Sequence, residues 1–167
     1  MELQQISVFV ENRAGRLADI TEILAAHKID IRALSIADTT DYGILRLIVN
    51  DPGGAVAALK QAGLTASATQ VLAICVPDVP GGFAKAMRLL AGAGISVEYA
   101  YAFLTPEAGN AYVILRVEDQ AAAESALAAN GERLRVFDSA LEPAVPRTRG
   151  NKLRKIYVVV IAHPLHL

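Results

Sequence analysis

The fold is decided by QISVFVENRAGRL at residues 5–17, because a matching stretch, VLAICVPDVPGGF, follows at residues 71–83, 66 positions later. Ile6, Val8 and Val10 alternate with other side chains in the first stretch, and apolar residues stand at all three matching places in the second. Such a period of two is typical of a half-buried strand. The chain therefore contains an internal repeat, and each copy is expected to form the same unit.

Both copies predict the same six elements, in the order strand, helix, strand, strand, helix, strand. In the first copy, alternation and helical spacing of apolar residues place them at residues 6–10, 17–26, 29–37, 44–49, 52–62 and 64–70. In the second copy the corresponding segments are 72–76, 83–93, 95–103, 111–117, 120–129 and 133–139. Pro52, which follows Asp51, favours the first position of a helix there.

This order predicts an α+β fold made of two ferredoxin-like βαββαβ modules, each with an antiparallel sheet covered by helices on one face. We expect the first module at residues 1–70, the second at 71–142 and a tail at 143–167. In the return strands, residues 44–46 (ILR) align with residues 114–116 (ILR), which implies that the second hairpin is longer by four residues.

The tail has no counterpart in the first copy. It carries five basic side chains and no acidic ones, all of them between Arg147 and Lys155, whereas the chain from Met1 to Glu142 holds 11 basic and 17 acidic side chains. The apolar run at residues 156–162 is β-prone and far too short to span a bilayer, so an added edge strand is one expectation. A disordered extension and a nucleic-acid-binding arm remain open.

Composition narrows the classes of protein. With 53% hydrophobic and 20% charged residues, the chain has ample material for a core. No apolar run approaches the roughly 20 residues of a membrane helix, and the N-terminus lacks a basic region followed by an apolar one, so we expect a cytoplasmic protein away from membranes. The single cysteine, Cys75, lies in an apolar strand and favours a buried structural role.

No catalytic motif is present. The sequence lacks a nucleophile and base at motif spacing, a Cys-x-x-Cys and a phosphate-binding glycine run, so we expect no enzyme and no cofactor. His163 and His166 are two histidines without a third ligand, which does not predict a metal site. Tyr99, Tyr101 and Phe103 give a faint version of an RNA-binding surface, but the first copy lacks it and the body of the chain is acidic.

The corner between the first strand and the first helix is the candidate site in both copies. An oxygen-bearing side chain, Asn12 or Asp78, precedes a glycine, Gly15 or Gly81, by three positions. A helix N-terminus offers unpaired backbone N–H groups to a carboxylate, and the side-chain oxygen suits an ammonium group. The corner therefore suits an α-amino acid, although Asn12 and Asp78 could instead simply cap the helices.

These corners, NRAGRL at 12–17 and VPGGF at 79–83, resemble the Asn-x-Pro-Gly-x-Leu opening of ACT domains, and the resemblance covers residues 3 to about 140. In that family, paired modules bind small ligands, mostly amino acids, at the interface between them. By position, the resemblance implies these ligand contacts: Asn12, Ala14, Gly15, Ile31, Asp78, Pro80, Gly81 and Val97. The chain departs from the pattern at Ala14, where proline is usual, and at Asp78, where asparagine is usual.

The resemblance to stand-alone tandem ACT proteins implies a non-catalytic amino-acid sensor that forms a homodimer or larger even oligomer. An alternative is an interaction module that docks on a metabolic enzyme without binding a ligand. A weaker alternative is an RNA-binding regulator that acts through the basic tail. Neither the amino acid nor the partner follows from these patterns.

Overall fold

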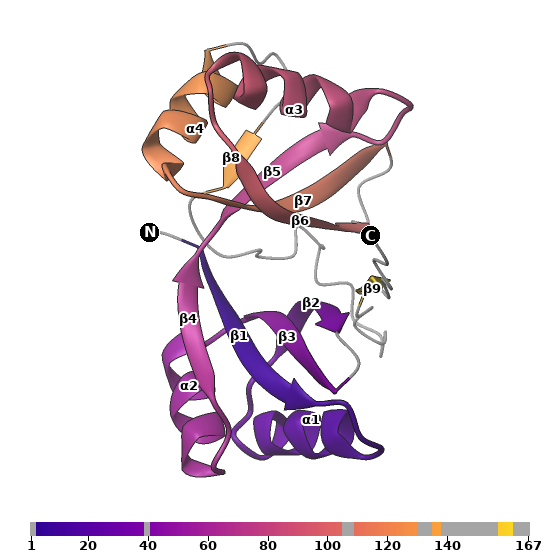
Figure 1. The fold of residues 1–167 in the computed structure, drawn as a ribbon, viewed down its shortest axis with the longest axis vertical. Helices are drawn as coiled ribbons and strands as arrows, with labels where there is room; N and C mark the ends of the chain where they lie inside the picture. The colour runs from indigo at the N-terminus through magenta and orange to yellow at the C-terminus, as the bar shows by residue number, and fades with distance from the viewer. Residues whose placement is uncertain (1–2, 39–40, 105–108, 130–134, 138–156, 162–167) are drawn as a thin grey trace, which may run out of the picture. The chain divides into compact units, whose positions relative to one another are not determined.

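The computed structural model describes residues 3–38, 41–104, 109–129, 135–137 and 157–161. The chain divides into two compact units, one formed by Gln4–Thr69 with Arg154–Leu167 and the other by Met1–Leu3 with Gln70–Leu153. Each unit contains one sheet, with two helices on one of its faces (Figure 1).

The first module consists of six elements: β1 (Gln4–Glu11), α1 (Arg16–Ala26), β2 (Ile31–Asp38), β3 (Tyr42–Val49), α2 (Pro52–Gln61) and β4 (Ala66–Gln70). The second module repeats the order: β5 (Leu72–Pro77), α3 (Gly82–Gly92), β6 (Val97–Leu104), β7 (Asn110–Val117), α4 (Gln120–Ala128) and β8 (Arg135–Phe137). The predicted ferredoxin-like order is thus confirmed in both copies.

The strand order is β4-β1-β3-β2-β9 in one sheet and β6-β7-β5-β8 in the other. In each module the first strand pairs antiparallel with the third, and the third pairs antiparallel with the second. Two split βαβ units result, with the first and third strands in the middle and the helix crossovers on one face.

The predicted alignment of the return strands is wrong by two residues. Ile6 pairs with Leu47 and its counterpart Leu72 pairs with Leu115, so Leu47 of β3 corresponds to Leu115 of β7. Ile44 therefore corresponds to Tyr112, and the second hairpin is longer by two residues rather than four. A shift of two leaves the strand alternation in phase, so the apolar pattern cannot detect it.

The core of each module lies between its sheet and its helices. In the first module, the fully buried side chains include Ile6 and Leu47 from the sheet, Ile20 and Leu24 from α1, and Leu59 from α2. The second module has its own cluster of buried strand and helix residues. Side chains that are at most 2% exposed in this cluster include Leu72, Ile74, Leu90, Leu115 and Leu127. Leu24 and Leu90 occupy the same place in the repeat. Each module thus buries a hydrophobic cluster of its own.

The second helix of each module begins with an aspartate cap. Asp51 Oδ1 accepts a hydrogen bond of 2.9 Å from Gly54 N–H, and Pro52 occupies the first helical position as predicted. Asp119 Oδ1 accepts a bond of the same length from Ala122 N–H. These caps fix where the chain leaves the sheet and enters α2 and α4.

The expected added edge strand is present as β9 (Tyr157–Ile161), which pairs in parallel with β2. Its register runs from Ala33 opposite Tyr157 to Ala37 opposite Ile161. The basic stretch from Arg147 to Lys155, together with His163 and His166, lies outside the described residues. Among the helices that are described, none is both long and apolar enough to cross a membrane.

Candidate functional site

The first corner joins β1, which ends at Glu11, to α1, which begins at Arg16. Gly15 is the N-cap residue and has φ = 86°, a left-handed conformation that favours glycine. No side chain caps this helix. Gly15, and not Asn12, therefore occupies the N-cap position of α1.

The second corner has a similar N-cap conformation. Gly81 is the N-cap of α3 with φ = 88° and makes no side-chain cap, so Asp78 does not occupy the N-cap position either. All the predicted contact residues of the two corners are exposed: Asn12, Ala14, Gly15, Asp78, Pro80 and Gly81. Two different sequences thus place a left-handed glycine at the start of the helix.

Each corner is fastened to the hairpin of its own module. Asn12 N–H donates to the carbonyl oxygen of Asp41 at 2.9 Å, and Asp78 N–H donates to that of Gly109 at 2.9 Å. The two acceptors directly precede β3 and β7 and so occupy equivalent places in the repeat. The hairpin therefore fixes the position of Asn12 and Asp78, a role that the sequence did not reveal.

The first turn of each helix leaves two backbone donors without an acceptor. In α1 the first helical bond runs from Asp19 N–H to Gly15 O at 2.9 Å, and in α3 from Lys85 N–H to Gly81 O at 3.1 Å. Among the described residues, no acceptor receives the N–H groups of the two preceding positions, which are Leu17 and Ala18 in α1, and Phe83 and Ala84 in α3. Such groups at the positive end of a helix dipole attract anions.

The glycines also leave space at these donors. A Cβ atom added at Gly15 or Gly81 would meet nothing within 4 Å. At Gly82, by contrast, a Cβ atom would collide with the carbonyl oxygen of Pro77, so this glycine is required for the close packing of α3 on β5. Sequence reasoning missed Gly82, because its counterpart in the first copy is Arg16.

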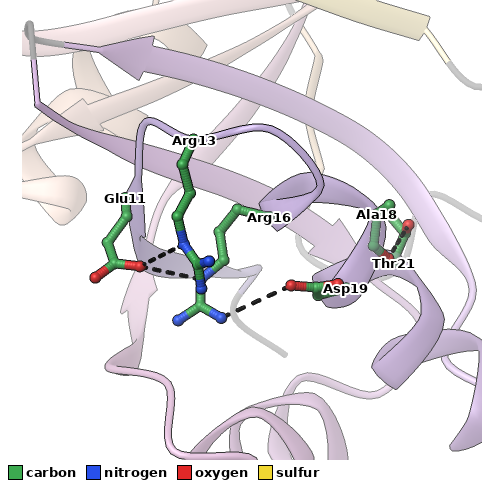
Figure 2. Close-up of polar contacts among 6 residues, drawn as sticks. All are labelled: Glu11, Arg13, Arg16, Ala18, Asp19 and Thr21. Carbon is green, nitrogen blue, oxygen red and sulfur yellow. Dashed lines mark hydrogen bonds and ion pairs between the residues drawn. The ribbon is translucent and has the colours of Figure 1, made fainter.

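The two corners differ in charge. At the first, Arg13 Nε lies 2.9 Å from Glu11 Oε2, while Arg16 lies 3.7 Å from Glu11 through Nε and 3.8 Å from Asp19 through Nη1 (Figure 2). At the second, the counterpart of Arg13 is Val79, which is 59% exposed. The first corner thus presents paired charges beside its helix, and the second presents apolar side chains.

Ile31 and Val97 lie far from the corner of their own module. Ile31 pairs with Val49 at one end of β3, whereas Glu11, beside the corner, pairs with Tyr42 at the other end. The seven intervening steps of strand span about 23 Å. In the second module, Val97 pairs with Val117 at the end of β7 that lies away from the corner. One module alone therefore brings together Asn12, Ala14 and Gly15, but not Ile31.

A family model described as an ACT domain pair matches residues 1–134. The chain belongs to the ACT domain family. Protein BT0572 from Bacteroides thetaiotaomicron, known as a crystal structure, is 38% identical with a TM-score of 0.75, over 81% of this chain and 93% of that one. This similarity extends to most of both ACT modules. No curated protein sequence gives a significant match.

The ACT fold is also that of regulatory subunits of aspartate kinase. The ligand-free regulatory subunit from Thermus thermophilus has 20% identity and a TM-score of 0.57, over 77% of this chain and 91% of that one. The Thermus flavus subunit has 18% identity and a TM-score of 0.56, over 75% of this chain and 90% of that one. At these identities the likeness shows the fold alone.

Proposed function

We propose that this ACT protein is a non-catalytic regulatory sensor that binds an amino acid at the interface between ACT modules. The observation that carries the proposal is the repeated corner: two sequences form the same turn, with a left-handed glycine and two N–H donors that no side chain caps. These donors suit the ligand carboxylate, and the oxygens of Asn12 and Asp78 suit its ammonium group.

The distance from each corner to Ile31 or Val97 supports a site shared between modules. A strand start and a corner about 23 Å away in the same module cannot contact one small ligand. A ligand that contacts both needs the corner of one module and the strand start of another. This requirement agrees with the expected homodimer. Sedimentation at micromolar concentration would test for the dimer, and a single 17.7 kDa species would contradict the dimer.

A thermal-shift screen against the twenty amino acids tests the function. A ligand that binds only the folded state raises stability by RT ln(1 + [L]/Kd), about 2.7 kcal/mol when the ligand is at 100 times its Kd. We expect one amino acid or a small group of them to raise the melting temperature, and Asn12→Ala or Asp78→Ala to reduce the shift. No shift with any amino acid would contradict the proposal.

An interaction module that docks on a metabolic enzyme is the second candidate function. Phe9 and Tyr42 stack with ring centroids 5.1 Å apart and are 51% and 47% exposed, and Ile44 is 36% exposed. Their register places all three on the helix-free face of the first sheet. Exposed apolar side chains of this kind favour protein contact. Phe9→Ser with Tyr42→Ser should abolish enzyme binding without changing amino-acid affinity.

The RNA-binding alternative gains no support from the second sheet. Tyr99 and Tyr101 lie on β6, which is an outer strand, whereas the base-stacking aromatics of RNA-binding modules with this fold lie on the middle strands. Tyr101 is moreover only 4% exposed. We therefore favour a cytoplasmic amino-acid sensor over a protein that binds RNA through this sheet; the basic tail of the RNA-binding alternative lies outside the described residues.

A further inference from the structure

The outer faces of α1 and α3, which are turned away from the sheets, carry opposite charges at equivalent places. At the repeat offset of 66 residues, Lys85 of α3 corresponds to Asp19 of α1. Arg88 likewise corresponds to Glu22. All four residues are exposed, on helices that lie against the sheets of their own modules (Figure 1). The first helix of one module is thus acidic where that of the other is basic.

These charges are largely available to a partner. The sequence of α3 contains no acidic residue, and neither Lys85 nor Arg88 forms an ion pair with a described residue. On α1, Asp19 Oδ2 lies 3.8 Å from Arg16 Nη1, yet the side chain of Asp19 remains 55% exposed. Glu22 forms no ion pair within the part of the chain that the structure describes. Solvent is therefore the main neighbour of both pairs of charges in one module alone.

The outer faces have little bulk around the charges. Their other exposed members, at helical spacings of three and four, are small: Ala18, Ala25, Ala26, Ala84, Ala91 and Gly92. Packed helices lie about 8–10 Å apart, depending on the side chains at the contact. Small residues on both faces allow the closer distance, at which charged side chains of one helix reach those of the other.

The second helices of the modules show no such match. Each carries a single charged residue, Lys60 on α2 and Glu124 on α4. When the two helices are aligned on their aspartate caps, Lys60 corresponds to Ala128, and Glu124 corresponds to Val56. Opposite charges at equivalent places thus belong to α1 and α3 alone among the described helices.

We propose that the outer face of α1 in one copy of the chain docks on the outer face of α3 in a second copy. Opposite charges meet in this pairing, whereas contact of α1 with α1, or of α3 with α3, opposes like charges. An antiparallel approach of the helices places Asp19 beside Arg88 and Glu22 beside Lys85. Exposed ion pairs each contribute little free energy, so these charges choose the partner face, and burial of the small residues adds affinity.

The proposal rests on the homodimer of the proposed function and adds which modules meet in it. A dimer with two-fold symmetry makes every contact twice, so each copy uses both of its faces. The first module of one copy then lies beside the second module of the other.

Exchange of the charges tests the docking, with sedimentation of the full-length chain as the measurement. The basic variant carries Asp19→Lys with Glu22→Arg, and the acidic variant carries Lys85→Glu with Arg88→Glu. We expect the parent to dimerise and each variant to dimerise at least tenfold more weakly, because like charges now face each other. All four substitutions in one chain should restore the parent affinity. An equal mixture of the two variants should form a mixed dimer.

Charge changes on the second helices supply the control. Glu124→Lys and Lys60→Glu reverse exposed charges of the same signs on α4 and α2, and should leave dimerisation within twofold of the parent. Melting curves verify that every variant is folded, as expected for substitutions of exposed residues.

The outcomes separate the docking from the function. A monomeric parent would overturn the docking and the homodimer together. A parent dimer that neither reversal weakens would overturn the docking alone, as would reversals that the fourfold variant does not rescue. A rescued fourfold variant without a mixed dimer would place the pairing of α1 and α3 within one chain and so overturn it between copies.

Discussion

The first corner, Asn12 to Leu17, and the second, Asp78 to Phe83, have similar N-cap conformations and different side chains. Both place a left-handed glycine before the helix and fasten the chain to the following hairpin by one 2.9 Å bond. The first surrounds this turn with Arg13, Arg16 and Glu11, and the second with Val79 and Phe83. What the corners share suits the ammonium and carboxylate that all amino acids carry, and what differs should set which amino acid each prefers.

The largest effect should come from the cores, where the modules are most alike. Leu24→Ala and Leu90→Ala remove equivalent side chains that are 0% and 1% exposed. Each should lower the free energy of unfolding of its module by about 2–5 kcal/mol through lost burial and a residual cavity. Urea unfolding with hydrogen exchange for each module measures this. A loss below about 1 kcal/mol in either variant would mean that its module is not packed as described.

The glycines test whether the shared backbone is also the shared site. Gly15→Val and Gly81→Val should each cost about 1–2 kcal/mol of stability because φ is left-handed. They should also lower amino-acid affinity at least tenfold, because the side chain enters the open space beside the donors. Gly15→Asn and Gly81→Asn are the matched controls for strain, since asparagine tolerates this conformation better. Valine variants that melt lower yet bind as tightly as the parent would place the site elsewhere.

A smaller difference lies at the ends of α1 and α3. Lys28 has φ = 58°, and the equivalent residue of the second module is Gly94, with φ = 72°. Lys28→Gly should therefore raise the free energy of unfolding of the first module by up to about 1 kcal/mol. Its melting temperature should rise accordingly. Differential scanning calorimetry measures the change. Gly94→Lys is the reciprocal control and should lower the melting temperature; an unchanged value in both would mean that the left-handed residue carries no strain here.

The smallest effect on binding should follow removal of the tail. Only the first module has an added strand, β9 on β2, among the described residues, and neither corner includes it. Deletion of residues 147–167 uncovers the edge of β2 but should leave amino-acid affinity within tenfold of the parent, a difference of at most about 1.4 kcal/mol. Isothermal titration of the folded variant measures this. A larger loss would show that the tail contributes to the site.

The element order was predictable because alternation and helical spacing occur twice in the chain. The alignment of the return strands was less predictable from the sequence. Ile44 corresponds to Tyr112 rather than Ile114, and strand alternation is unchanged by a shift of two residues. The run at residues 156–162 suggested an edge strand, but β propensity carries no information about which edge it joins. Only the structure shows that β9 pairs with β2.

The candidate site was predictable in its backbone and less so in its surroundings. A glycine three residues after Asn12 or Asp78 indicated the turn, and both glycines have the left-handed φ that such a turn needs. The bonds to Asp41 and Gly109 join positions far apart in the sequence, and no local pattern marks them. The separation of Ile31 from Asn12 likewise follows only from strand register.

A crystal structure with bound ligand tests the central claim most directly. The protein would be crystallised with the amino acid that raises its melting temperature most. We predict that the ligand carboxylate lies about 3 Å from the N–H groups of Leu17 or Phe83, with the ammonium group beside Asn12 or Asp78. A well-ordered amino acid bound elsewhere, with both corners holding only water, would contradict the account.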